Sequence, residues 1–129
     1  MNRKKVKFGG TSREQDELAG LVEQGVKVAI SSLKFFQDEG LAVPTSIGDK
    51  WAIENSLGEL VCLVEVTAVC YRSFGEIDET FAIAEGDGSF DRWYSIHSVY
   101  YSHLLNKHKQ ELTDQTILEC VYFKKSEEQ

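Results

Sequence analysis

The sequence predicts an α+β domain, a small mixed or antiparallel β-barrel flanked by helices. Helical and strand patterns do not alternate strictly along the chain, which disfavours a doubly wound parallel sheet. Apolar alternation over residues 59–71 is longer than a usual strand, so this segment is expected to bend around a barrel. A chain of 129 residues can bury one core but not two. We therefore expect residues 1–129 to form a single domain, with its core at about residues 8–123 and frayed termini.

The composition is typical of a globular protein, and we expect it to be cytoplasmic. The hydrophobic fraction is 42% and the charged fraction 27%, both ordinary for a folded domain. No run approaches the ~20 apolar residues that cross a bilayer, and residues 1–5 lead into no apolar secretory segment. Cys62, Cys70 and Cys120 form no CxxC pair, so we expect reduced core thiols rather than disulfides. No metal, cofactor or membrane partner is expected, whereas a homodimer is left open.

The net charge restricts the way in which a nucleic acid could bind. A formal charge of −7 repels phosphate backbones at long range, which argues against broad binding through counterion release. A nucleic-acid partner must therefore bind through short-range contacts at a particular site. The one dense basic cluster, Arg3, Lys4, Lys5 and Lys7, either contacts phosphates or is a solvated tail.

The first half of the chain predicts helices on either side of a strand, followed by a second strand. Thr11 and Ser12, with Glu14 and Gln15, offer two overlapping capping boxes that begin a helix over residues 12–24, and Gly25 ends it. Residues 26–30 are rich in β-branched side chains and predict a strand. Residues 31–39 predict a return to helix, 44–49 a loop, and 50–54 a strand.

The second half predicts a long strand, an acidic loop and a long helix. A turn at residues 55–58 precedes the strand, and its alternation assigns to one face Leu60, Cys62, Val64, Val66, Ala68 and Cys70. Residues 75–88 suggest a short helix and then a glycine-flanked loop. Ser89 can cap the longest helix, whose main apolar stripe comprises Trp93, Ile96, His97, Tyr100 and Leu104. Residues 116–123 predict the last strand, and 124–129 a frayed end.

Several short motifs occur along the chain in a characteristic order and spacing. They are Phe8-Gly9-Gly10, Gly25-Val26-Lys27, Ile47-Gly48-Asp49, and the segments 63–67, 72–78, 84–88 and 92–97. In this order they resemble the ASCH family, the activating-signal-cointegrator homology domains, and specifically its compact bacterial branch. The resemblance extends from about residue 8 to residue 123. Any one motif would be weak, and the order and spacing carry the signal.

The resemblance implies a PUA-like barrel with a cleft between the strand after the first helix and the acidic loop before the long helix. Members of the family are mostly regarded as RNA-associated or nucleotide-binding. A small branch hydrolyses the amide of acetylated cytidine. The expected partner is therefore a nucleotide, a nucleoside or a single-stranded RNA base.

Lys27, Glu85 and Asp87 are the main candidates for the ligand site. Lys27 occupies the lysine of the family's glycine-x-lysine motif, where a cation can hold a phosphate or polarise an oxyanion. Glu85 and Asp87 lie two apart among glycines, so both carboxylates can be directed at a base edge, a ribose hydroxyl or a proton. The alternative for this pair is a solvated turn that precedes the next helix.

Three residues of the long helix are further candidates for ligand contact. Trp93 and Tyr94 could stack on a nucleobase, a contact worth about 1–3 kcal/mol in single-strand binders, although the stripe pattern favours a core position for Trp93. His97 could be a general base or a donor to the ligand, or a satisfied residue at the edge of the core.

The hydrolytic branch of the family is described with a lysine, a glutamate and a threonine nucleophile. Here the threonine position holds Ile30, which has no hydroxyl, and the acidic partner would be Asp87. Ser31 or Ser32 could replace the hydroxyl, with Lys27, Ser32 and Asp87 as the tentative catalytic set, although Ser32 would need a bulge to reach Lys27.

Three functions remain open from the sequence. The leading one is a binding module for a nucleotide or RNA base, with Lys27, Ser31, Ser32, Glu85, Asp87, Trp93, Tyr94 and His97 as ligand-binding candidates. The first alternative is an amidohydrolase for a modified, acylated cytidine nucleoside. The second is an interaction domain whose aromatic stripe meets a protein partner.

Overall fold

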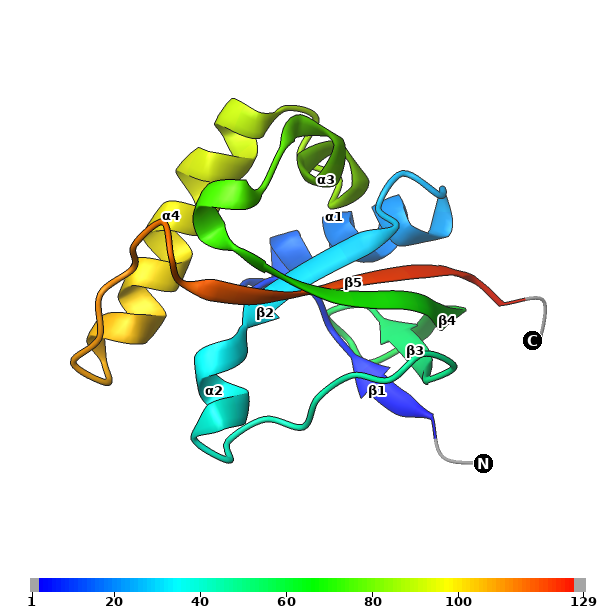
Figure 1. Ribbon diagram of the computed structural model, residues 1–129. Helices are drawn as coiled ribbons and strands as arrows, with labels where there is room; N and C mark the ends of the chain where they lie inside the picture. Colours follow the sequence, from blue (N-terminus) through cyan, green and yellow to red (C-terminus); the bar gives the residue numbers. More distant parts are fainter. Residues whose placement is uncertain (1–2, 127–129) are drawn as a thin grey trace.

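The computed structural model describes residues 3–126 and contains one mixed sheet that curves into a half-barrel (Figure 1). The strand order is β1-β3-β4-β5-β2, with β1 parallel to β3 and every other pair antiparallel. The predicted α+β class and the barrel with flanking helices are confirmed. The elements are β1 (Lys4–Val6), α1 (Ser12–Glu23), β2 (Ala29–Leu33), α2 (Lys34–Asp38), β3 (Lys50–Glu54), β4 (Leu60–Ser73), a 3-10 turn (Phe74–Glu76), α3 (Glu79–Ala84), α4 (Phe90–Asn106) and β5 (Ile117–Lys125).

The first helix begins and ends as its sequence predicts. Of the two overlapping capping boxes, the pair Thr11 and Glu14 is used: the threonine hydroxyl accepts from the Glu14 N–H, and the glutamate carboxylate accepts from the Thr11 N–H. Gly25 follows the helix with φ +78°, a left-handed conformation that glycine adopts without strain. Val26 and Lys27 donate their N–H groups to the carbonyl of Leu21, which closes the helix end.

The strand predicted over residues 26–30 lies three residues later, at Ala29–Leu33. The residues that close the helix end cannot also pair in the sheet, so pairing with β5 begins only at Ala29. Ser31 and Ser32 then belong to the strand, opposite Cys120 and Glu119. This later start shortens the predicted helix over residues 31–39 to the five residues of α2.

A bulge in β4 overturns the prediction that one face of this strand carries every even-numbered residue from 60 to 70. The register against β5 shifts between Val66 and Ala68, which leaves Thr67 as an extra residue. Before the bulge Val64 and Val66 face one side of the sheet, and after it Cys70 faces the other side. The even-numbered residues of β4 therefore face one side of the sheet before Thr67 and the other side after it.

The sheet separates two apolar cores. One contains Phe8, residues of α1, and the inward residues of β3 and the first part of β4: Phe8, Ala19, Val22, Trp51, Ile53, Cys62, Val64, Val66, Val121 and Phe123. The other lies beneath α3 and α4: Ala29, Leu33, Phe74, Ile77, Phe81, Ala82, Trp93, Tyr101, Leu105, Leu118 and Cys120. β5 contributes to both cores, because its successive side chains point to opposite faces.

Two short segments near the ends are ordered where frayed ends were expected. Lys4–Val6 form the edge strand β1, although these residues were expected to lie outside the folded core. Lys124 and Lys125 extend β5 beyond the predicted residue 123, opposite Glu65 and Val64. Residues 127–129, also predicted to be frayed, lie outside the described residues. Within residues 3–126, no helix is both long and apolar enough to cross a membrane.

Candidate functional site

Lys27 lies buried between the end of α1 and the start of β2, and its side chain is 3% exposed. Its amino group donates to the carbonyls of Ala29 (2.8 Å) and Glu85 (3.1 Å) and lies 3.6 Å from the Glu85 carboxylate. The ring of Phe8 covers the amino group, with its centroid 5.0 Å away. Three oxygen acceptors around the nitrogen match the three N–H donors of an ammonium group.

Glu85 is the centre of this arrangement. It follows the last residue of α3, and its carboxylate reaches under α4, where it is almost fully buried. The oxygen Oε2 accepts from the Ser31 hydroxyl at 2.7 Å and from the Trp93 indole N–H at 2.6 Å. The same oxygen lies 3.6 Å from Nε2 of His97. Chain segments far apart in the sequence thus supply the partners of one carboxylate.

The direction of the hydrogen bonds around Ser31 follows from the chemistry of its partners. An ionised carboxylate only accepts, so the single hydroxyl hydrogen of Ser31 points at Glu85. The Tyr101 hydroxyl, 2.6 Å from the Ser31 oxygen, must then donate to it. The result is a chain in which Tyr101 donates to Ser31 and Ser31 donates to Glu85.

Asp87 and His97 lie at the rim of this buried cluster. Their side chains are 15% and 13% exposed, and Oδ2 of Asp87 is 3.9 Å from Nδ1 of His97. That histidine nitrogen also lies 2.9 Å from the Trp93 carbonyl, to which it donates. Between the two acids, Gly86 has φ +97°, and a Cβ atom there would lie 3.3 Å from the Cβ of Lys27. The glycine therefore permits both the turn and its close approach to Lys27.

Charge and burial act against each other in the pKa values of the buried pair. Burial opposes the charged form of Glu85, but the hydrogen bond from His97 and the positive charge of Lys27 outweigh it and lower the pKa to about 2. Burial lowers the pKa of Lys27, and the negative charges of Glu85 and Asp87 reduce this effect. A carboxylate with so low a pKa is ionised throughout the physiological range.

The two rim residues have raised pKa values. Burial, helped by the negative charge of Glu85, raises the pKa of Asp87 against the opposing charge of His97. For His97, burial acts in the lowering direction, but the bond to Glu85 and the charges of both acids raise the pKa above its ordinary value. Both shifts favour the protonated forms of the rim residues.

The structure brings together most of the predicted site residues, and it separates two from them. The assembled ones are Lys27, Ser31, Glu85, Asp87, Trp93 and His97. Ser32 is exposed and points to the opposite face of β2, because successive strand residues alternate. Tyr94 is 47% exposed and packs against Phe74 and Phe90. In the tentative catalytic set of Lys27, Ser32 and Asp87, the serine is thus outside the cluster.

Tyr101 belongs to the cluster and was not among the predicted site residues. Its ring is buried and its hydroxyl bonds to Ser31. It lies eight residues after Trp93 on α4, so the same helix face carries both side chains, and this spacing was the available signal. The predicted main stripe is partly wrong, because Ile96 and Tyr100 are exposed. The buried stripe is instead Trp93, Tyr101 and Leu105, with His97 at its edge.

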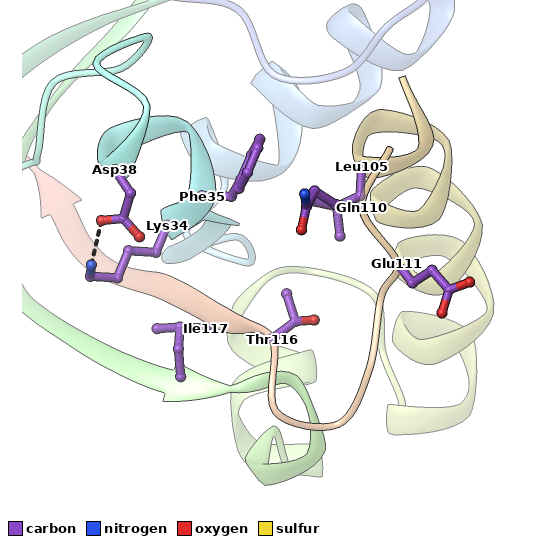
Figure 2. A pocket seen from close by; sticks show the side chains of 8 residues that line it. All are labelled: Lys34, Phe35, Asp38, Leu105, Gln110, Glu111, Thr116 and Ile117. Carbon is purple, nitrogen blue, oxygen red and sulfur yellow. Dashed lines mark hydrogen bonds and ion pairs between the residues drawn. The ribbon is translucent and has the colours of Figure 1, made fainter. Parts of the chain in front are cut away.

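Two hollows on the surface of residues 3–126 contain no member of the cluster. The first, about 180 Å³, lies between α2, the end of α4 and the start of β5 (Figure 2). Its lining includes the exposed ion pair of Lys34 and Asp38, whose atoms are 2.6 Å apart. The second hollow lies at the edge strand β1. No three His, Cys, Asp or Glu side chains of residues 3–126 are arranged to hold a metal ion.

Comparisons with known proteins agree with the fold. A family model described as the ASCH domain matches residues 4–127. The solved ASCH domain from Lactobacillus crispatus JV V101 superimposes with a TM-score of 0.91 at 23% identity, covering 96% of this chain and 79% of that one. A protein from Enterococcus faecalis V583 gives a TM-score of 0.86 at 23% identity, covering 98% and 77%. None of the curated proteins matches the chain significantly.

Proposed function

This chain belongs to the ASCH domain family, and from that premise we propose that it binds a nucleotide or the unstacked base of a single-stranded RNA. The binding position is the rim of the buried cluster, at Asp87 and His97. Members of the family are mostly regarded as RNA-associated or nucleotide-binding, which agrees with this proposal. The contacts at the rim support it.

The observation that carries the proposal is the free accepting capacity of Asp87. Among residues 3–126, its carboxylate has an ion-pair distance to His97 and no hydrogen bond. Glu85, by contrast, is enclosed and accepts from two donors. A partly buried carboxylate without donors is favourably placed to accept N–H groups from a ligand, and bonds to a charged acceptor are the stronger kind.

The chemistry of the rim favours bases that present neighbouring N–H donors. A carboxylate accepts two parallel N–H bonds, and the Watson–Crick edge of guanine offers two adjacent donors. Uracil offers one. An unstacked base is required, because in a helix these edges are paired. We therefore expect guanosine to bind more tightly than uridine.

Lys27 supports the site from beneath. Its amino group donates to two backbone carbonyls and forms an ion pair with the Glu85 carboxylate, so we assign it to holding Glu85 and the backbone of the acidic turn. Through Glu85, its charge fixes the position of His97 and hence of the rim. This role differs from direct phosphate contact, which was the first expectation for Lys27.

Replacing Asp87 by asparagine tests the proposal. The change keeps the size of the side chain and removes the charge, so guanosine affinity should fall about tenfold to a hundredfold, the range of a bond to a charged group. Isothermal titration with guanosine and uridine measures it. Asp91→Asn, in the first turn of α4 and exposed, is the matched control and should leave affinity unchanged. Equal affinity in D87N and the unaltered protein would refute the proposal.

Hydrolysis of an acylated cytidine is a second candidate, favoured by one distance. The Ser31 hydroxyl lies 2.7 Å from Glu85, which is the geometry of a nucleophile and its base. Against it, Ser31 is 7% exposed and Glu85, with a pKa of about 2, is a weak base at neutral pH. The candidate therefore ranks below binding.

Acetate release from N4-acetylcytidine decides whether this second candidate holds. If the chain is a hydrolase, purified protein releases acetate and Ser31→Ala abolishes the release, whereas Ser32→Ala, on the opposite face, does not. We expect no acetate above the background rate, because of the weak base. Release that depends on Ser31 would make the domain an enzyme.

A further inference from the structure

The second hollow, at the edge strand β1, concentrates positive charge on an acidic protein. It measures about 280 Å³ and is lined by Arg3, Lys4, Asp49, Lys50 and Trp51. Three cations and one acid give these residues a formal charge of +2, whereas the whole chain carries −7. Long-range attraction of a polyanion is thus absent, and these residues offer local attraction instead.

The fold holds these side chains in place. In the parallel pairing of β1 and β3, Lys4 lies opposite Trp51, and its amino group is 5.9 Å from the centroid of the indole ring. Trp51 is 6% exposed and packs against Phe8 and Phe123, so the floor of the hollow is rigid. The carboxylate of Asp49 accepts a hydrogen bond from the Ser46 N–H at 2.9 Å, within its own loop.

The basic hollow and the Lys27 cluster are neighbours across a single aromatic contact. The ring centroids of Trp51 and Phe8 are 6.4 Å apart, and the Phe8 centroid is 5.0 Å from the amino group of Lys27. All three side chains are buried, so this contact runs through the core, and a strand that meets both the hollow and the rim must pass over the surface of the domain. A single buried indole offers little surface for base stacking, so the chemistry of the hollow is that of cations meeting phosphate.

We propose that the basic hollow binds backbone phosphates of the single-stranded RNA. This inference rests on the proposed function, because it extends the ligand from one base at the rim to a short strand. Lys4 and Lys50 meet phosphate oxygens as point charges, and Arg3 adds a planar group suited to two oxygens. The base contributes selectivity at Asp87, and the phosphates contribute affinity and register.

The salt dependence of RNA binding tests the inference. For single strands the slope of log affinity against log salt is about −0.7 for each phosphate contact. Fluorescence anisotropy with a labelled guanosine-containing RNA octamer, between 50 and 200 mM salt, gives this slope. The double variant Lys4→Gln with Lys50→Gln should make the slope shallower by about 1.4, two contacts' worth. Lys107→Gln with Lys109→Gln, exposed lysines beyond α4, is the matched control and should not change it.

Two further measurements separate the possible outcomes. Guanosine, which has no phosphate, should bind the Lys4 and Lys50 variant as it binds the unaltered protein, so a loss there would indicate damage at the rim. Inorganic triphosphate should compete only weakly with the octamer. Competition as strong as that of the octamer would identify a free phosphate compound as the ligand and overturn the inference. An unchanged salt slope in the double variant would overturn it as well, even if D87N confirms the base site.

Discussion

Glu85 shows how a single carboxylate can depend on the fold for its charge. Its partners lie in the segment before β2, in β2 itself and in α4, and none of these contacts exists in an unfolded chain. The neighbouring cation and the donors compensate for the loss of water around the group. Folding and ionisation of this residue are therefore linked.

The linkage gives a pH dependence with a definite sign. The pKa of Glu85 is about 2 in the folded protein and near 4.5 when unperturbed, so its ionisation stabilises the fold above pH 4.5. This contribution, about 3 kcal/mol, is lost as the pH falls from 4.5 towards 2. Urea unfolding at pH 7, 4 and 3 measures it.

The variant Glu85→Gln isolates this residue from the other acids. It leaves the Lys27 charge buried without its counter-ion, so we expect about 3 kcal/mol lower stability at pH 7. When the pH is lowered, the free energy of unfolding of this variant should fall by about 3 kcal/mol less than that of the unaltered protein. Glu111→Gln, an exposed acid in the loop before β5, should behave as the unaltered protein. An identical acid loss in E85Q would contradict the assignment.

At the scale of elements, the turn between α3 and α4 fixes the geometry of the site. Gly86→Ala places a Cβ at φ +97° and within 3.3 Å of Lys27, and left-handed backbone costs an L-residue about 1–2 kcal/mol. Gly20→Ala is an internal contrast, because Gly20 lies inside α1 with no atom within 4 Å of the added Cβ. It should stabilise the protein by about 0.5–1 kcal/mol. Urea midpoints compare the two, and opposite signs are expected.

The element boundaries show what local sequence signals determine. Thr11 and Ser89 begin helices because their hydroxyls accept from N–H groups three residues later, a local effect that the sequence reveals. The start of β2 was misplaced, because it depends on pairing with β5, about ninety residues later in the chain. Despite that error, strand alternation already indicated that Ser32 would need a bulge to reach Lys27, and the structure places Ser31 in the cluster.

For the molecule as a whole, the order of motifs, through the family resemblance, predicted a barrel flanked by helices and the meeting of Lys27 with the acidic turn. It did not predict that Glu85 and Asp87 have different environments. Glu85 is enclosed and Asp87 lies at the rim, and this difference arises from the packing of α4 on α3. The spacing of Tyr101 from Trp93 was visible in the sequence, but the contact of its hydroxyl with Ser31 is a tertiary one that the sequence did not reveal.

The extra residue at Thr67 has a consequence for the way the domain unfolds. At Thr67 the side chains of β4 change from one core to the other. Both cores therefore depend on β4 as one continuous strand. β5 is shared in the same manner. Unfolding of one core would disrupt the strands β4 and β5, on which the other core also depends. The two cores therefore unfold as one cooperative unit with a single transition.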